Sequence, residues 1–397
     1  MLVYQFDMMQ TLTLAAIVLL VGRFIRKKVA FFEQFFIPSP VIGGVLYSII
    51  TLIGHSSGAF EFTYDGQLKT LFMVAFFTTI GFAASFKLLK KGGVQVGIFL
   101  GVATVLVILQ NVLGVSLAKA FHLNPLLGLA VGSIPLTGGH GTSGAFGPVL
   151  EAAGAHGAMA VSIASATFGL IAGCIIGGPI AKRLMAKHGI TSGTDDGAQH
   201  FQGLEKPEEE RITETTLLNT VYLIVLCMGV GTVVSVVIKK AGIVLPIYIG
   251  PMLVAAIVRN IADAKSINLH HKSIDSMGNI SLSLFLAMAL MTMRLWDLAA
   301  LAIPLVVMLL AQTALMAAFA YFVTFKIMGR DYDAAVISCG HCGFGMGATP
   351  NAMANMESFT GSNFPSPRAF FVLPLVGALF IDFTNASIIT FFINIFS

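Results

Sequence analysis

Long apolar segments alternate with short polar ones along almost the whole chain. A membrane-spanning helix needs about 20 largely apolar residues, and this criterion picks out 8–24, 40–54, 67–86, 94–120, 156–186, 215–240, 244–261, 274–294, 297–326 and 366–395. Two further apolar segments, 124–152 and 331–360, contain clusters of glycine. The pattern therefore predicts an all-α polytopic membrane protein with about ten transmembrane helices.

A polar stretch, 188–213, divides the chain into two similar halves. It contains the charged run Glu208-Glu209-Glu210-Arg211 and too few apolar residues to build a core, so it reads as a cytoplasmic linker. On either side, 1–187 and 214–397 each hold five predicted spans and one glycine-rich segment in the same order. Because each half has an odd number of spans, the second half has the opposite orientation in the membrane to the first. The sequence thus predicts two inverted five-span repeats, an arrangement common among secondary transporters.

The two glycine-rich stretches are the most informative parts of the sequence. They run from Thr137 to Ala145 and from Cys339 to Asn351. Glycine allows unusual backbone conformations and exposes peptide groups. At membrane depth such backbone is tolerated only where protein covers it or where it lines a watery cavity. We therefore expect both stretches to be tips of re-entrant hairpins at which a solute binds. Close helix packing is the alternative use of glycine.

The chemistry of the tips suits a small charged solute. Helix N-termini and backbone N–H groups favour anions, whereas carbonyl and hydroxyl groups can coordinate a small cation. His140 and His341 occupy matching places, which suit a proton relay and a turn or packing role equally well. The candidate substrate-binding residues are Thr137, Gly138, Gly139, His140, Gly141, Thr142, Ser143, Gly340, His341, Gly343, Gly345, Ala348, Thr349 and Asn351.

Asp382 is the sharpest single candidate for an ion site. It lies well inside the last predicted span, where a carboxylate costs a few kcal/mol and usually marks an ion or substrate path. The matching stretch of the first half, 173–179, has no acid. The candidate sodium ligands are Asp382, Asn385, Asn355 and Asn111, with no other metal expected. The alternatives are a structural carboxylate paired with a neighbouring polar residue and amides that only bridge helices.

Composition and charge agree with a membrane location. The chain is 56% hydrophobic and 11% charged, with a mean hydropathy of +0.88, against about 25% charged residues in soluble domains. If the N-terminus lies outside, the outer side holds five of the 23 basic residues, Lys69, Lys119, Lys239, Lys240 and Arg294, and the cytoplasmic side holds the other 18. The positive-inside rule then places both termini in the periplasm and the central loop in the cytoplasm. The net charge of +4 points to no nucleic-acid partner.

Signatures of enzymes are lacking. The sequence has no P-loop, no H-E-x-x-H and no G-x-S-x-G motif, so we expect neither an enzyme nor a cofactor. Cys339 and Cys342 have C-x-x-C spacing, which is typical of a redox dithiol in a soluble strand-to-helix context. The first glycine-rich stretch repeats the histidine frame without any cysteine, which argues against redox chemistry. A membrane redox protein and a channel whose filter is built from the same loops remain alternatives.

Several long runs resemble the bacterial sodium/glutamate symporter family, and the resemblance covers nearly the whole chain. The runs are Ile37 to Gly44, Leu136 to Thr142, Ala166 to Gly169, Gly278 to Leu290, Asp331 to Val336, Gly340 to Gly345 and Ala348 to Ala352. The resemblance implies sodium-coupled import of L-glutamate across the inner membrane by a homodimer with an elevator-type movement. It maps the family's hairpin loops onto Thr137 to Gly144 and Gly340 to Asn351.

The resemblance leaves close alternatives open. Glutamate, aspartate and dicarboxylates differ by a methylene or an ammonium group, a difference worth only a few kcal/mol in a binding pocket. Another small organic anion as substrate, or protons as the coupling ion, would fit the same residues.

Overall fold

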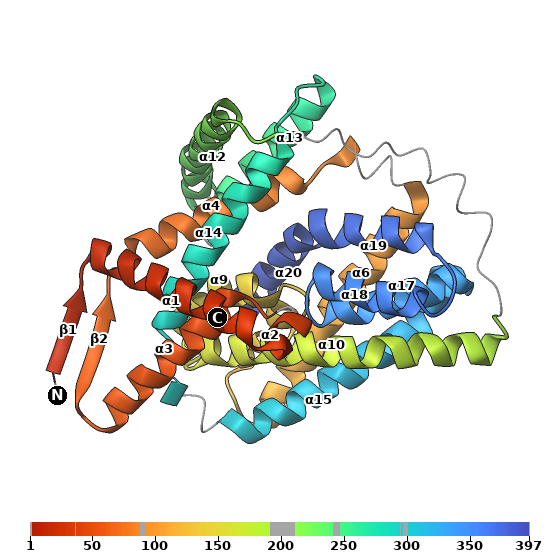
Figure 1. Ribbon diagram of the computed structural model, residues 1–397, viewed down its shortest axis with the longest axis horizontal. Helices are drawn as coiled ribbons and strands as arrows, with labels where there is room; N and C mark the ends of the chain where they lie inside the picture. The colour runs from red at the N-terminus through yellow and green to blue at the C-terminus, as the bar shows by residue number, and fades with distance from the viewer. Residues whose placement is uncertain are drawn as a thin grey trace. The chain divides into compact units, whose positions relative to one another are not determined.

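The computed structural model describes residues 2–35, 37–87, 93–190, 211–240, 247–293, 295–296 and 301–396. Most of the predicted linker, 191–210, lies outside these ranges. Figure 1 shows the helices and strands of the chain, and these form two compact units. Unit 1 comprises Met1–Ala84, Gly144–Ala160 and Glu210–Ala302, and unit 2 comprises Ser85–Ser143, Val161–Glu209 and Ile303–Ser397. Each unit therefore combines segments from both halves of the chain.

Unit 1 contains the first three long helices of each half. They are α1 (Met8–Lys28), α3 (Ser39–Ser56) and α4 (Gln67–Ala83), followed by α12 (Glu214–Lys240), α13 (Ile249–Ala264) and α14 (His271–Met291), with the short α2 (Ala30–Gln34) after α1. Asp7 and Gln10 form a reciprocal capping box that starts α1. Small residues let α1 and α3 approach closely, because a Cβ on Gly43 would lie 2.0 Å from the carbonyl oxygen of Val18.

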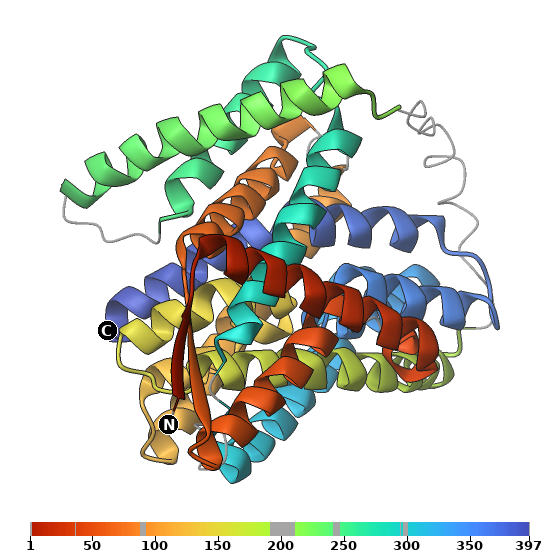
Figure 2. The same ribbon diagram turned by 60° about the vertical axis from the view of Figure 1, so that its left-hand side comes forward.

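Unit 1 also contains a pair of short strands that the hydropathy pattern does not predict. β1 (Leu2–Phe6) and β2 (Phe60–Tyr64) pair in parallel, with Leu2 opposite Phe60 and Phe6 opposite Tyr64, and Figure 2 shows them running side by side. Both segments are rich in aromatic and β-branched residues, which favour strands. The described residues are otherwise helical or irregular, so the all-α prediction is right for nearly all of the chain.

Unit 2 is built from the fourth and fifth segments of each half. From the first half it contains α6 (Gly93–Ala120), α7 (Pro125–Ala130), α8 (Ser133–Leu136), the start of α9 (Gly139–Ala152) and most of α10 (Ala158–His188). From the second half it contains most of α15 (Ala302–Phe319), the π-helix η3 (Ala320–Thr324), α16 (Phe325–Ile327), α17 (Tyr332–Gly345), α18 (Thr349–Thr360), α19 (Pro367–Leu379) and α20 (Ile381–Phe396). Buried apolar side chains of α6, α17 and α19, among them Phe99, Phe344 and Leu373, form its core.

The helix lengths bear out a multi-pass membrane protein. Within the described residues, seven helices are long and apolar enough to cross a membrane, and an eighth span results if α19 and α20, bent by 43°, count as one. Two predicted spans, 67–86 and 244–261, form the 17-residue α4 and the 16-residue α13. These fall short of the usual length, so ten spans and their inverted arrangement remain predictions.

Candidate functional site

Both glycine-rich stretches interrupt helices at the expected places. In segment 124–152, α8 ends at Leu136 and α9 begins at Gly139. In segment 331–360, α17 ends at Gly345 and α18 begins at Thr349. We call the two interruptions tip 1 (residues 137–139) and tip 2 (residues 346–348). Each tip is thus flanked by the carbonyl end of one helix and the amide end of the next, which carry partial charges of opposite sign.

The two tips pack against each other within unit 2. Gly139 has a φ of +64°, which favours glycine, and a Cβ there would lie 3.2 Å from the carbonyl oxygen of Gly347. On α10, a Cβ on Gly169 would lie 2.1 Å from the carbonyl oxygen of Met346. Stretches about 200 residues apart in the sequence are therefore brought together, and glycine is what allows the close approach.

Gln110, a residue outside the predicted set of site residues, joins the two tip regions. Its side chain is fully buried on α6. Gln110 Oε1 accepts a hydrogen bond from Thr137 Oγ1 at 2.8 Å, and Gln110 Nε2 donates to the carbonyl oxygen of Gly345 at 2.6 Å. Gln312 Nε2 of α15 donates to the Gln110 carbonyl at 2.7 Å. The sequence feature that points to Gln110 is the adjacent polar pair Gln110-Asn111 in an otherwise apolar span.

Two of the predicted sodium ligands converge on Ser133, at the start of α8. Asn111 Oδ1 accepts from the Ser133 N–H at 2.9 Å, and Asn385 Nδ2 donates to the Ser133 carbonyl at 3.1 Å. All three side chains are buried. Asn111 Nδ2, Asn385 Oδ1 and Ser133 Oγ have no hydrogen-bond partner among the described residues. Buried polar atoms nearly always have a partner, so this trio is marked out as a place for a ligand.

The other two predicted sodium ligands lie elsewhere. Asn355 Nδ2 donates to the carbonyls of Gly173 at 2.9 Å and Cys339 at 3.3 Å, which ties α18 to α10 and α17. The structure gives this amide a helix-bridging contact. Asp382 is half-buried in the first turn of α20, three residues before Asn385, and such a spacing places both on one helix face. Asn111 and Asn385 therefore lie together at Ser133, Asp382 shares a helix face with Asn385, and Asn355 lies elsewhere.

Asn351 presents an open oxygen beside tip 2. Its Nδ2 donates to the Leu170 carbonyl on α10 at 2.9 Å. Its Oδ1 is buried and has no partner in the described part of the chain. A Cβ on Gly347 would lie 3.0 Å from Asn351 Nδ2, so this amide lies directly at the tip. Among the predicted substrate-binding residues that the structure describes, Asn351 Oδ1 and His341 Nε2 are the buried side-chain atoms without a hydrogen-bond partner.

The two histidines have different surroundings despite their matching places in the sequence. His140 Nε2 lies 3.0 Å from Thr167 Oγ1, and that hydroxyl donates to the Ile163 carbonyl, so the imidazole is the donor. His341 Nδ1 lies 2.9 Å from Thr324 Oγ1 in the π-helix, and the ring packs against Phe99, Phe319 and Phe344. Both histidines contact a threonine hydroxyl, but His341 Nε2 is buried without a hydrogen-bond partner in the part of the chain that the structure describes.

The remaining predicted substrate-binding residues lie around the tips and in the flanking helices. Ser143 Oγ donates to the Ser162 carbonyl at 3.3 Å. A Cβ on Gly340 or Gly343 would collide with α18, at Met356 and Asn351 respectively, so these two glycines serve helix packing. Five others lie at tip 1, in the first turn of α9 or at the start of α18, and these are Gly138, Gly141, Thr142, Ala348 and Thr349.

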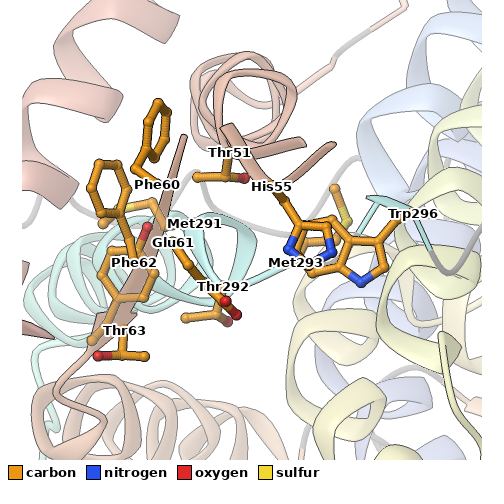
Figure 3. A pocket seen from close by; sticks show the side chains of 11 residues that line it. Thr51, His55, Phe60, Glu61, Phe62, Thr63, Met291, Thr292, Met293 and Trp296 are labelled. Carbon is orange, nitrogen blue, oxygen red and sulfur yellow. The ribbon is translucent and has the colours of Figure 1, made fainter. Parts of the chain in front are cut away.

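An open cavity of about 230 Å³ in unit 1 contains none of the predicted site residues (Figure 3). It is lined by β2, the end of α3 and the residues that follow α14. The His55 and Trp296 rings stack at its edge, with centroids 4.0 Å apart and an interplanar angle of 10°. The stack connects the ends of α3 and α14, so both helix ends lie on one face of unit 1.

The cysteines are free thiols. Cys339 and Cys342 are both buried within α17, and Cys339 Sγ contacts the Asn355 carbonyl at 3.5 Å. Within the described residues, no group of three or more His, Cys, Asp or Glu side chains could hold a metal ion.

Comparison with known proteins gives one consistent result. The family model for the sodium/glutamate symporter matches residues 4–364. The chain is 42% identical over 391 residues to the sodium/glutamate symporter of Haemophilus influenzae, covering 97% of both chains. It is also 42% identical over 394 residues to the proteins of the same name from Escherichia coli and Shigella flexneri, covering 98% of each chain. On the strength of these matches, this chain belongs to the sodium/glutamate symporter family.

Proposed function

We propose that this protein is a sodium-coupled symporter that imports L-glutamate across the bacterial inner membrane. The observation that carries the proposal is the contact between the two tips inside unit 2, next to buried polar atoms without partners. The relatives named above are sodium/glutamate symporters, which supports the identity of both solutes. Membership of a family of symporters also argues for a carrier rather than an enzyme.

The tips offer groups of both polarities, as a zwitterionic amino acid requires. The amide ends of α9 and α18 begin at tip 1 and tip 2, and the carbonyl ends of α8 and α17 finish there. Helix N-termini stabilise carboxylates, and helix C-terminal carbonyls stabilise ammonium or sodium. We place the glutamate carboxylates toward the amide ends. Asn351 Oδ1 lies beside tip 2 and can accept a hydrogen bond from the ammonium group.

Hydrogen-bond accounting refines the assignment of the sodium ligands. The open atom of Asn385 is an oxygen, which suits Na⁺, whereas the open atom of Asn111 is an amino group, which suits an anion. We therefore assign Asp382 and Asn385 to sodium. We assign Asn111 to the anionic end of the substrate instead, and we assign Asn355 a structural role as a bridge between helices.

We infer the membrane orientation from charge, and two contacts in unit 1 bear on which ends of the predicted spans share a side. β1 precedes α1 and β2 follows α3, so their pairing keeps the N-terminus on the same side as the end of the second predicted span. The stack of His55 on Trp296 puts the end of the eighth predicted span on that side as well. Both contacts put these ends on one side, as the predicted order of spans requires, and the choice of the periplasm for that side rests on charge alone.

The division into two units is the arrangement that an elevator-type carrier needs. Unit 2 contains both tips and every residue proposed to bind solute, and unit 1 contains the other long helices of both halves. We propose that unit 2 carries the solute while unit 1 serves as the scaffold of a homodimer. His140 and His341 hold hydroxyl groups in this scheme, and protons have no coupling role.

The test is uptake of labelled glutamate by the purified protein in liposomes. A sodium gradient, a proton gradient and no gradient are compared, with aspartate and 2-oxoglutarate as competitors. We expect uphill accumulation with sodium alone, and strongest competition by unlabelled glutamate. Uptake with protons alone would refute the assigned coupling ion. Large currents in planar bilayers without accumulation would refute the carrier and leave a channel.

A further inference from the structure

The side-chain amide of Gln110 is shared between the two tip regions. Thr137 Oγ1 donates to its oxygen and its nitrogen donates to the Gly345 carbonyl, at 2.8 and 2.6 Å. Thr137 lies at tip 1, and Gly345 is the last residue of α17 before tip 2. The side chain is fully buried. One side chain thus joins one hairpin to the other through two short hydrogen bonds.

The direction of these hydrogen bonds is fixed by chemistry. A backbone carbonyl can only accept, so the nitrogen of Gln110 must face Gly345 and the oxygen must face Thr137. Only a side chain that accepts at one atom and donates at the other satisfies both partners. The backbone of Gln110 is tied in turn to α15 through Gln312. One hydrogen-bond network therefore joins α6, α15 and the two tips.

We propose that Gln110 is a positioning residue that holds the two tips in the arrangement that binds solute. This inference rests on the proposed function, because it assumes that solute binds at the tips. Gln110 acts through Thr137 and Gly345 and contacts no solute itself. A site made of two tips binds solute and sodium together only while the tips keep their positions relative to each other. Loss of the amide therefore weakens the apparent affinity for both.

The experiment uses Gln110→Met and Gln110→Glu with the full-length transporter in liposomes. We expect Gln110→Met to raise the KM for glutamate and for sodium about tenfold, corresponding to about 1.4 kcal/mol. Vmax per folded transporter should change much less, because the variant retains the tips and the helices. Both KM values staying within about twofold of the parent would overturn the inference.

Gln110→Glu supplies a readout that general damage to the core would not give. A protonated carboxylic acid can donate to the Gly345 carbonyl and accept from Thr137, as the amide does, whereas the ionised form cannot donate. The KM for glutamate of this variant should therefore approach the parent value as the pH is lowered and resemble that of Gln110→Met at high pH. The parent and Gln110→Met are measured across the same pH range. A profile for Gln110→Glu that runs parallel to both would contradict the proposal.

Thr104→Val is the control. Thr104 lies on α6, as Gln110 does, and its hydroxyl donates to the Leu100 carbonyl of the same helix, with no hydrogen bond to either tip among those described. Its KM values should stay within about twofold of the parent. A tenfold rise in this control would mean that any lost side-chain hydrogen bond on α6 disturbs the site, and the inference would fall. If the parent itself accumulates no glutamate, the proposed function fails rather than the role of Gln110.

The coupling between Gln110 and Thr137 gives a second measurement. Thr137→Val removes the hydroxyl that donates to Gln110. If the two residues act through one hydrogen bond, the double variant with Gln110→Met should raise the KM by less than the product of the single effects. Fully multiplicative effects would show that the residues act independently and would overturn the proposal. Thr137→Ser, which keeps the hydroxyl, should restore parent values.

Discussion

At the scale of single residues, the site is defined by what its polar atoms lack. Asn111, Asn385 and Asn351 each use one end of the amide in a hydrogen bond and leave the other end without a partner among the described residues. Leaving a buried polar group unsatisfied costs about 1–3 kcal/mol. If solute binds there as proposed, it recovers that cost, with a cation or a donor at the open oxygens and an anion at the open amino group.

Asp382→Asn tests the sodium assignment. Replacing the carboxylate by a neutral amide removes the charge that attracts the cation, so the apparent sodium affinity should fall at least about tenfold, or about 1.4 kcal/mol. Sodium titrations of glutamate uptake measure this. Glu33→Gln, an exposed acid on α2, is the control and should match the parent. Unchanged sodium dependence in Asp382→Asn would remove this residue from the ion site.

Asn111→Asp tests whether Asn111 faces the anion. The carboxylate can still accept from the Ser133 N–H, but it presents a negative oxygen where the amide presented its amino group. The KM for glutamate should therefore rise about tenfold or more, because like charges repel, while the sodium affinity stays near the parent value. A tighter affinity for sodium with an unchanged KM for glutamate would return Asn111 to the ion site.

At the scale of elements, the sequence predicts where the long helices lie better than it predicts the contacts between elements. Hydrophobic length predicted the long helices within a few residues, because burial in lipid requires apolar segments of that length. It could not predict the pairing of β1 with β2, since strand pairing depends on a partner 58 residues away. Glycine content predicted the breaks at both tips.

The pairing of side chains around the site could be predicted only in part. Asn111 and Asn385 stand out in the sequence as polar residues in apolar spans, and they do converge on Ser133. Asn355 stands out on the same ground but lies against α10. Composition identifies a buried amide but not its hydrogen-bond partner, because the partner is a backbone group of a distant helix. Ser133 was missed for the same reason.

Gly139→Ala tests the contact between the tips. The residue has a φ of +64° and would bring a Cβ within 3.2 Å of the Gly347 carbonyl oxygen, and the left-handed backbone alone costs about 1–2 kcal/mol for alanine. We expect a lower melting temperature and at least about a tenfold loss of glutamate uptake.

Gly178→Ala is the matched control for this change. It lies inside α10, where nothing stands within 4 Å of the added Cβ, and alanine favours a helix interior. Uptake and melting temperature should equal or exceed those of the parent. Equal behaviour of the two alanine variants would show that the tips do not need their close approach.

At the scale of the whole molecule, the chain runs repeatedly from one unit to the other. Unit 1 and unit 2 are each assembled from three separate segments. Hydropathy along the sequence divides the chain into two consecutive halves. The structure instead packs the first three spans of both halves into unit 1 and the last two spans of both halves into unit 2. The grouping depends on packing between distant helices, which no local pattern encodes.

Membrane orientation is testable with single cysteines. In a variant whose four natural cysteines are replaced by serine, Ser57→Cys should react with an impermeant maleimide in intact spheroplasts. Lys265→Cys, after α13, should react only after the membrane is opened, because positive-inside bias places it in the cytoplasm. The reverse pattern would invert the orientation. Uptake by each variant confirms that it is folded.

The discontinuous composition of the units has a consequence for biosynthesis. A ribosome delivers the chain from the N-terminus onward, so α1, α3 and α4 enter the membrane long before their partners α12, α13 and α14 are made. The tip 1 region likewise waits for α17 to α20, which are translated much later. Neither unit can reach its final packing until its segments from the second half have emerged. The first half must therefore persist in the bilayer as an unfinished assembly, with its buried amides not yet paired across helices.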